Sequence, residues 1–452
     1  MGLGSLTSGG ATIRPDTAPN RAALFPTLRP SAQQEDNEIM NAPLREPRLA
    51  APAKTDMPMS TAEFIGLVAM MMALTALSID IMLPALPAIG EALGVADANN
   101  RQIIIISYMA GFAAGQLVYG RLSDRYGRKP VLMAGMAIFI IGSLVATLAV
   151  DFTMLLAART MQGIGAAAPR VIAFAVVRDR YSGREMARVM SFAMAVFIII
   201  PVLAPSMGQG LLFVGSWRLM FDLLLVAGII IAVWAGLRLP ETMRHHASEP
   251  LSLPASLRLA LETRQTIGYA ASGGLIFGTV LGYVSSAQQV FVDVFGLGAL
   301  FPLAFGATAL MIAASSLTNA LLVERLGMRR LSHVSLAVFI ALSAVLVVAA
   351  LLGGAGFWLF MGVMAPLFYL FGLIAPNFNA MAMEPQGDNA GMASSVVGFV
   401  STAIGALAGG FVGHMFDGTV LPLALGFFAL SSVCLAVVLW VEGPRGLFNP
   451  TR

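Results

Sequence analysis

Two charged side chains stand inside apolar runs that are long enough to cross a membrane. Asp80 lies in ALSIDIMLPALP and Arg159 lies in LLAARTMQGIG. A charged group at that depth is expensive and by default functional. We therefore expect Asp80 to load and release a proton. The alternative for Asp80 is a helix-end carboxylate near the outer surface, since Pro84 and Pro87 follow it. The alternative for Arg159 is a side chain that reaches the outer headgroups.

The composition is that of an integral membrane protein. Hydrophobic residues make up 58% of the 452 residues and charged residues 11%, with a mean hydropathy of +0.81. Soluble domains hold about 25% charged residues, so this chain has too little polar surface for a water-soluble globule. Continuously apolar segments of about 20 residues indicate spanning helices rather than a barrel. We predict an all-α membrane protein with twelve transmembrane helices, at about 63–86, 101–122, 131–150, 153–177, 187–212, 217–238, 267–290, 299–322, 331–352, 356–382, 389–414 and 419–441.

These helices are expected to form two six-helix bundles, at residues 61–238 and 267–442, with a cytoplasmic linker at 239–266. Residues 1–60 hold eight prolines and no long apolar run. They predict a disordered cytoplasmic tail, the alternative being a start codon assigned too early. Residues 443–452 form a short C-terminal tail. Lys and Arg concentrate in alternate loops, which predicts that both termini are cytoplasmic.

A dense group of charges follows the second predicted helix, in GRLSDRYGRKP at residues 120–130. The second half repeats the pattern, because SDRYGRK and VERLGMR share an acid, an arginine, a glycine and a basic residue in register. Parallel repeats of this kind indicate two pseudo-symmetric bundles with the substrate site between them at the midplane, the major facilitator architecture. The aligned pairs are Asp124/Glu324, Arg125/Arg325, Gly127/Gly327 and Lys129/Arg329.

The charges at this turn predict a cytoplasmic gate. The preference of Lys and Arg for cytoplasmic loops is enough to explain the arginines. It does not explain Asp124, because acidic residues contribute little to the orientation of membrane helices. A carboxylate can cap the positive end of a helix, so we expect Asp124 at the helix start near Ala390 and Arg128 paired with Asp179. Both contacts would hold the two bundles together and break when the protein opens inward. The predicted gate comprises Gly120, Asp124, Arg125, Gly127, Arg128, Lys129 and Asp179, with Glu324, Arg325 and Gly327 in the second half.

Several stretches resemble a known family. GRLSDRYGRKP is similar to the cytoplasmic signature of the major facilitator superfamily. SIDIMLPALPAIGEAL (78–93), LLAARTMQGIGAAAPRVIAFAVVRD (155–179) and PVLAPSMGQG (201–210) resemble signatures of its twelve-span drug:proton antiporters. The Ala-Pro pair of the last stretch, with PNFNAMAMEP and AGMASSVVGF, resembles the bicyclomycin-resistance (Bcr/CflA) subfamily. The resemblance covers about residues 60–442.

The resemblance implies roles for particular residues. Arg159 would sense whether the acid of the first helix, Asp80, is protonated. Some relatives carry a second acid two turns earlier, where this chain has Met72. The fifth helix would make a leak-tight contact with the eighth that favours exchange, although a plain kinked helix is the alternative. Its motif residues are Pro201, Ala204, Pro205 and Gly208.

Other polar and aromatic side chains are candidates for the substrate cavity. Core packing explains the aromatic residues equally well, and the alternative for the amides, with Asn319, is hydrogen bonding between helices. Arg170 could reach either the cavity or a structural carbonyl. The candidates are Tyr108, Phe112, Arg170, Tyr283, Asn377 and Asn379.

Taken together, these features predict a proton-coupled secondary exporter of drug-like or amphipathic small molecules in the bacterial inner membrane. The alternatives are a dedicated exporter or importer of one metabolite, such as an amino acid, sugar or siderophore, and a non-transporting membrane sensor. The chain has no P-loop, a single cysteine and four scattered histidines. We therefore expect no enzymatic activity, no metal and no cofactor, with the proton gradient as the energy source and a monomer as the working form.

Overall fold

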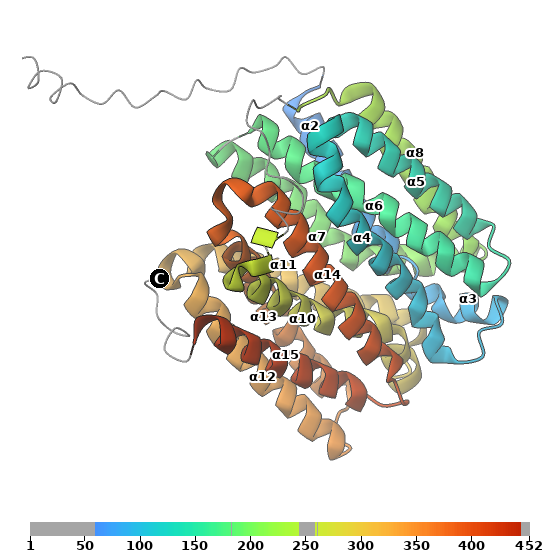
Figure 1. Cartoon of the computed structure of the whole chain (residues 1–452). Helices are drawn as coiled ribbons and strands as arrows, with labels where there is room; N and C mark the ends of the chain where they lie inside the picture. Colours follow the sequence, from blue (N-terminus) through green and yellow to red (C-terminus); the bar gives the residue numbers. More distant parts are fainter. Residues whose placement is uncertain (1–58, 182, 244–257, 260, 444–452) are drawn as a thin grey trace, which may run out of the picture. The chain divides into compact units, whose positions relative to one another are not determined.

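A computed structural model describes residues 59–181, 183–243, 258–259 and 261–443. The predicted N-terminal tail, most of the linker and the C-terminal tail lie outside the described residues. All regular structure within the described part is helical, and twelve helices or helix pairs are long and apolar enough to cross a membrane (Figure 1). This confirms the predicted fold class.

The first half of the chain forms six of these spans. The first span is broken into α2, the short 3-10 helix η1 (Leu83–Ala85) and α3, and the 3-10 helix η2 (Ala98–Gln102) leads into the second. The helices are α2 (Thr61–Asp80), α3 (Leu86–Ala92), α4 (Ile103–Tyr126), α5 (Arg128–Thr147), α6 (Phe152–Arg180), α7 (Gly183–Val214) and α8 (Arg218–Arg238).

The second half follows the same plan. Its first span continues through a π-helix, η3 (Gln289–Val294), and its fourth ends in the 3-10 helix η5 (Glu384–Asn389). The helices are α10 (Arg264–Gln288), α11 (Phe301–Leu326), α12 (Met328–Leu351), α13 (Phe357–Met383), α14 (Ala390–His414) and α15 (Leu421–Glu442).

Equivalent tight turns join α4 to α5 and α11 to α12. Gly127 and Gly327 end the first helix of each pair with φ of 99° and 76°. L-residues with side chains avoid this region of backbone space, so glycine is required at both turns. We call the end of the helices that carries these turns the Gly127 end, and the opposite end, with η2 and the α14–α15 loop, the Asn99 end.

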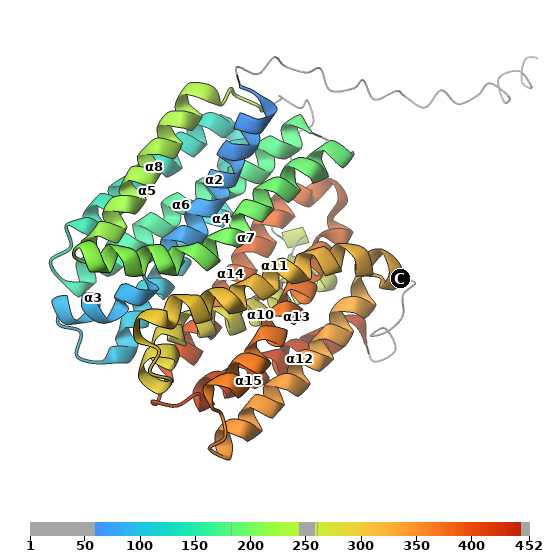
Figure 2. The ribbon, with the colours of Figure 1, turned by 180° about the vertical axis from the view of Figure 1, so that it is seen from behind.

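The two halves meet along two helix pairs, α4 with α14 and α7 with α11. Figure 1 shows α4 beside α14, and the reverse view in Figure 2 shows α7 beside α11. The second pair is the contact between the fifth and eighth spans that the resemblance implied. At this contact Gly306 of α11 faces Val202 of α7, whereas Gly208 of the motif packs against the backbone of Ile81.

Candidate functional site

Asp80 is the last residue of α2, and its side chain is only 6% exposed. The chain leaves the α-helix there and enters η1, where Pro84 can supply no backbone hydrogen. Within the described residues no basic group lies within ion-pair distance of this carboxyl. Removing a carboxylate from water costs several kcal/mol unless it is paired, so Asp80 is a buried acid that is suited to carrying a proton.

Arg159 of α6 is fully buried beside this break in α2. Its Nη2 donates to the backbone oxygen of Ser78 at 3.0 Å, its Nε donates to that of Ile104 at 3.4 Å, and its Nη1 donates to Gln162. The guanidinium also lies 4.4 Å from the ring centre of Tyr108. Arg159 therefore binds the backbone two residues before Asp80 and joins α2, α4 and α6. The implied role of sensing the proton on Asp80 stays a prediction.

Two buried hydroxyls near Asp80 make no hydrogen bond within the described part of the chain. They belong to Thr75 of α2 and Tyr108 of α4, which are 6% and 0% exposed. The Tyr108 hydroxyl lies close to the hydroxyls of Thr75 and Ser78, but its geometry to each of them is not that of a hydrogen bond. It is also within electrostatic reach of Asp80. Most buried polar atoms have a partner, so two unsatisfied hydroxyls close together are unusual and leave hydrogen-bonding capacity beside Asp80.

The predicted cavity aromatics are packed inside the bundles in this structure. Phe112 is 6% exposed and stacks on Tyr108 with ring centres 6.3 Å apart. Tyr283 is 1% exposed, bonds to Thr308 at 2.8 Å and contacts the ring of Phe368 at 4.7 Å. Both rings stabilise the core of their own half in the conformation described.

Among the candidate amides, Asn377 bonds between helices and Asn379 is exposed. The Asn377 amide of α13 donates to the side-chain oxygen of Asn319 on α11 at 2.8 Å. It also donates to the backbone oxygen of Leu373, so both of its hydrogens are used. Asn377 was expected either to line the substrate cavity or to hydrogen-bond between helices, and the structure shows the bond between helices.

Arg170 of α6 differs from Arg159 in having no hydrogen-bond or carboxylate partner among the described residues. Its guanidinium stacks on two phenyl rings, at 4.5 Å from the centre of Phe197 on α7 and 5.6 Å from that of Phe174. The side chain is partly exposed. The structural carbonyl that was one of its two expected partners is not found there.

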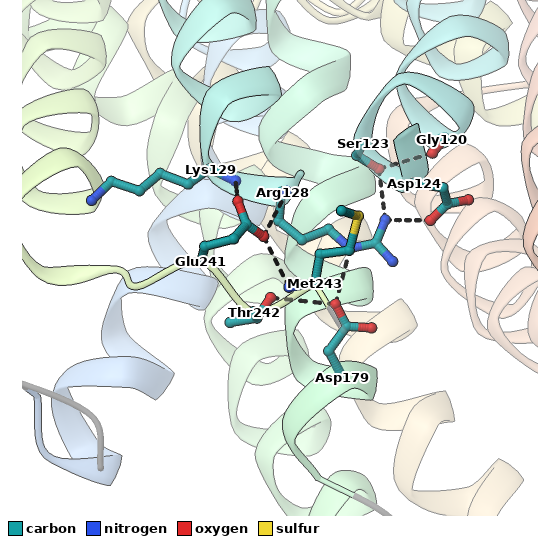
Figure 3. Close-up of polar contacts among 9 residues, drawn as sticks. All are labelled: Gly120, Ser123, Asp124, Arg128, Lys129, Asp179, Glu241, Thr242 and Met243. Atoms are coloured by element: carbon teal, nitrogen blue, oxygen red, sulfur yellow. Dashed lines mark hydrogen bonds and ion pairs between the residues drawn. The ribbon is translucent and has the colours of Figure 1, made fainter. Parts of the chain in front are cut away.

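The charged residues at the Gly127 end form one network (Figure 3). Arg128 binds Asp179 at 2.9 Å through Nε, and its Nη1 donates to Ser123 at 2.8 Å and to Asp124. Its side chain is almost buried, at 7% exposure. The expected Arg128–Asp179 pair is therefore present.

One inference about this pair is wrong. We expected it to hold the two halves together, but Arg128 begins α5 and Asp179 lies at the end of α6, so both belong to the first half. Asp124 is also paired within its own half, with Arg128, and is 51% exposed. The side chains around Ala390 lie outside the described residues, so the expected cap of α14 by Asp124 stays a prediction.

Glu241, which follows α8, completes this network and was missed in the sequence. Its carboxylate accepts backbone hydrogen bonds from Arg128 at 2.9 Å, Lys129 at 3.0 Å and Met243 at 2.9 Å. Figure 3 shows the Lys129 side chain pointing away, so only its backbone is bound. Partial burial opposes ionisation of Glu241, but the backbone hydrogen bonds outweigh it and lower the pKa of this carboxyl.

The sequence did contain a signal for Glu241, because an acidic residue comes just after the last helix of the first half. Two physical requirements meet there: the free N–H groups that begin α5 need acceptors, and the positive end of this helix favours an anion. The PET tripeptide at residues 240–242 places a carboxylate within reach of that end.

The second half has a comparable network around Arg329, the counterpart of Lys129. Arg329 binds Glu384 at 3.0 Å and Glu442 at 2.9 Å, and the hydroxyl of Tyr269 donates to Glu442 at 2.7 Å. Glu324 and Arg325 of the predicted second-half gate are exposed. In the second half, the arginine that binds carboxylates is therefore Arg329 and not the predicted Arg325.

At the Asn99 end the two halves are joined by uncharged amides, a feature that the sequence reasoning did not predict. Gln102 donates to Gln289 at 2.6 Å, and Gln289 donates to Asn99 at 2.9 Å. Asn99 in turn donates to the backbone oxygens of His414 at 3.0 Å and Phe416 at 2.8 Å. We call Asn99, Gln102 and Gln289 the amide lattice. The sequence shows amide residues beside a spanning helix, but it does not show their partners, because these lie far away in sequence.

Comparison with known proteins identifies the family. The family model described as Major Facilitator Superfamily matches residues 68–410. An uncharacterised MFS-type transporter, YdgK, of Bacillus subtilis is 30% identical over 81% of this chain and 92% of its own length. A bicyclomycin resistance protein homolog of Haemophilus influenzae is 28% identical over 80% of this chain and 92% of its own. The multidrug resistance protein MdtL of Escherichia coli is 34% identical over 48% of this chain and 55% of its own.

Solved structures agree in fold. The xylose transporter XylE from E. coli, in a partially occluded inward open conformation, matches with a TM-score of 0.66 and 12% identity over 85% of this chain and 98% of its own. The human organic anion transporter MFSD10 matches with a TM-score of 0.61 and 15% identity, over 85% of this chain and 100% of its own. The resemblance found in the sequence motifs is thus confirmed, and the chain belongs to the Major Facilitator Superfamily of membrane transporters.

Proposed function

We propose that this protein is a proton-coupled exporter of drug-like or amphipathic small molecules that works by alternating access in the bacterial inner membrane. The names of the relatives in Haemophilus influenzae and Escherichia coli support drug efflux. The observation that carries proton coupling is Asp80, a buried carboxyl at a break in α2 with no basic partner among the described residues.

The proposed cycle uses the charge on Asp80. When the carboxyl is ionised, it attracts polar or cationic groups nearby, including the dipoles of a bound substrate. When a proton arrives from outside, that charge disappears and the attraction weakens, so substrate leaves as the proton binds. Arg159 holds the backbone at Ser78, so it keeps the carboxyl-bearing turn in place as the charge changes.

Alternating access requires contacts that close one end while the other opens. The amide lattice joins the halves at the Asn99 end. Among the contacts of the described residues, the charged clusters around Arg128 and Arg329 at the Gly127 end each lie within one half. If both termini are cytoplasmic, as the loop charges predict, the lattice seals the outer side in the conformation described. A ligand or proton moves the equilibrium only through its different affinity for the two states.

The test uses everted membrane vesicles from cells that express the wild type, Asp80→Asn or Asp151→Asn. A pH probe reports proton movement when phenicols, bicyclomycin or sulfonamides are added to energised vesicles. Asp151 caps α6 and Asn caps a helix equally well, so this variant controls for loss of a carboxylate. We expect drug-triggered proton release in the wild type and Asp151→Asn but not in Asp80→Asn. No release in the wild type with any compound would refute drug:proton antiport.

A further inference from the structure

Arg170 is the charged side chain of the membrane-spanning part whose chemistry the proposed mechanism does not use. Ten residues separate it from Arg180, the end of α6, which is about 15 Å of helix. It therefore lies roughly half a membrane thickness from that end of the helix. An arginine at that depth almost always faces the protein interior or a water-filled cavity rather than lipid.

The surroundings of Arg170 leave its hydrogen-bond donors free. A guanidinium carries five N–H donors, and within the described residues none of them has an acceptor. The central carbon of the guanidinium lies over the rings of Phe197 and Phe174. Ring stacking leaves the edge of the guanidinium, where the N–H groups lie, open to a planar acceptor such as a carboxylate.

The position of Arg170 in the repeat also points to the substrate path. Both fourth spans contain an Ala-Pro pair in their interior, in Ala168-Pro169-Arg170 of α6 and in Ala375-Pro376-Asn377 of α13. In parallel repeats of this architecture the substrate site lies between the halves near the midplane. Asn377 has both amide hydrogens bonded, so of the two polar residues that follow these Ala-Pro pairs Arg170 is the one with donors to offer.

Arg170 also shares its surroundings with the acid site. The hydroxyl of Tyr108 is within electrostatic reach of both Arg170 and Asp80. That hydroxyl and the one on Thr75 are buried without hydrogen-bond partners. An unpartnered hydroxyl within reach of a guanidinium that has no acceptor among the described residues fits a site where an anionic or carbonyl-bearing group binds.

We propose that Arg170, flanked by Phe174 and Phe197, binds the anionic end of an aromatic or amphipathic substrate, with Tyr108 and Thr75 as further donors. The inference rests on the proposed transport function and deepens it, because it sets a substrate class. The anionic end binds Arg170, and the ionised Asp80 attracts a hydrogen-bond donor elsewhere on the same molecule. Organic acids and neutral molecules with strong acceptors fit the site, and permanent lipophilic cations do not. Arg159 and Arg170 add two positive groups to the surroundings of Tyr108, which disfavours a cation further.

The experiment measures ligand binding to purified protein, which does not depend on proton coupling or transport. Sulfathiazole is titrated at pH values below and above its own ionisation, beside neutral chloramphenicol and cationic tetraphenylphosphonium. The proteins are wild type, Arg170→Gln, Arg170→Lys, Phe197→Leu and Arg264→Gln. Arg264 also stacks on an aromatic ring, that of Trp440, but lies exposed at the start of α10. It controls for the loss of one stacked positive charge.

We expect the wild type and Arg264→Gln to bind the sulfonamide anion more tightly than its neutral form. Arg170→Gln should lose this preference, with about tenfold or more weaker binding of the anion, the usual effect of losing a charge-assisted hydrogen bond. Arg170→Lys, which keeps the charge without the planar fork, should be intermediate and carries the test if Arg170→Gln does not fold. Phe197→Leu should weaken binding of the anion as well.

Two results would overturn the proposal. One is unchanged binding of the anion in folded Arg170→Gln or Arg170→Lys, which would assign Arg170 to packing alone. The other is tighter binding of tetraphenylphosphonium than of the anion in the wild type. Failure of the transport function looks different: ligands would bind with the expected preference, but no vesicle assay would show proton movement.

Discussion

At the scale of single residues, the site separates two arginines that are alike in sequence. Both stand in the same helix, in the same apolar run. Arg159 is fully buried, and its hydrogen bonds to Ser78, Ile104 and Gln162 make it a structural clamp. Arg170 is partly exposed with free donors. The sequence could predict that both are functional or paired, but not which had acceptors, since two of the three acceptors of Arg159 are backbone oxygens of other helices.

The charge of Glu241 should stabilise the folded protein in a pH-dependent way, whereas packing of its side chain should not depend on pH. The pKa of Glu241 is lowered in the folded protein from the value of 4.5 that holds for the unfolded chain. Its contribution to stability is therefore complete above pH 4.5 and is lost as the pH falls through the lower pKa of the folded protein. We expect Glu241→Gln to unfold at a lower temperature than the wild type at pH 7, with the difference shrinking below about pH 4.5.

Thermal unfolding in detergent between pH 3.5 and pH 8 measures this difference. Glu91→Gln is the matched control, because Glu91 is exposed and its side chain makes no hydrogen bond within the described residues. A constant difference between wild type and Glu241→Gln at all pH values would show that the charge of Glu241 does not stabilise the start of α5.

At the scale of helices, glycines set how closely the spans approach one another. Gly163 of α6 faces α4 so closely that a Cβ atom there would lie 2.0 Å from the backbone oxygen of Tyr108. Backbone atoms cannot move aside as a side chain can, so even a methyl group must push the two helices apart. Small residues at membrane-helix contacts permit this approach.

We therefore expect Gly163→Ala to destabilise the protein by about 1–3 kcal/mol, the usual cost of overpacking. The measurement is the denaturant or thermal midpoint in detergent. Gly210→Ala in α7 is the control, because a Cβ at Gly210 meets nothing within 4 Å and alanine is the better helix former. Equal stability of Gly163→Ala and Gly210→Ala would mean that the α4–α6 contact is looser than described.

The helices themselves were largely predictable from the sequence, and their contacts were not. Apolar length alone located all twelve spans, because a helix is the structure that satisfies its own backbone in lipid. The break of α2 after Asp80 was foreseen only as nearby prolines. The amide lattice was invisible, since nothing in the neighbourhood of Asn99 indicates that its partners are near Gln289 and His414.

At the scale of the whole transporter, the two ends use different chemistry. Charged clusters lie at the Gly127 end within each half, and the amide lattice joins the halves at the Asn99 end. Amides carry no charge, so a contact made from them does not change with the pH outside the cell. The side-chain oxygen of Gln102 is buried without a partner, so the lattice lacks one bond and is easier to open.

Breaking the lattice should favour the state that is open at the Asn99 end. In a Cys434→Ser background, Ile106→Cys on α4 reports opening, because Ile106 faces Gly410 of α14. We expect Gln102→Ala to raise its labelling by an impermeant maleimide several-fold, as the loss of about 1 kcal/mol of hydrogen bonding implies.

Asn100→Ala is the control for this experiment, since the Asn100 side chain makes no hydrogen bond within the described residues. Labelling from outside that is equally slow in Gln102→Ala and Asn100→Ala would contradict a role of the lattice in holding the halves together. Fast labelling in all variants, including the background protein, would show instead that this end is normally open.

The central claim is that Asp80 exchanges a proton for substrate, and the most direct measurement is proton release from purified protein in weakly buffered solution. A pH indicator follows the addition of a ligand that each protein binds. We predict release in the wild type and in Asp151→Asn, increasing with ligand to a plateau, and none in Asp80→Asn that still binds the ligand. Equal release from Asp80→Asn and the wild type would contradict the account and move the proton site elsewhere in the transporter.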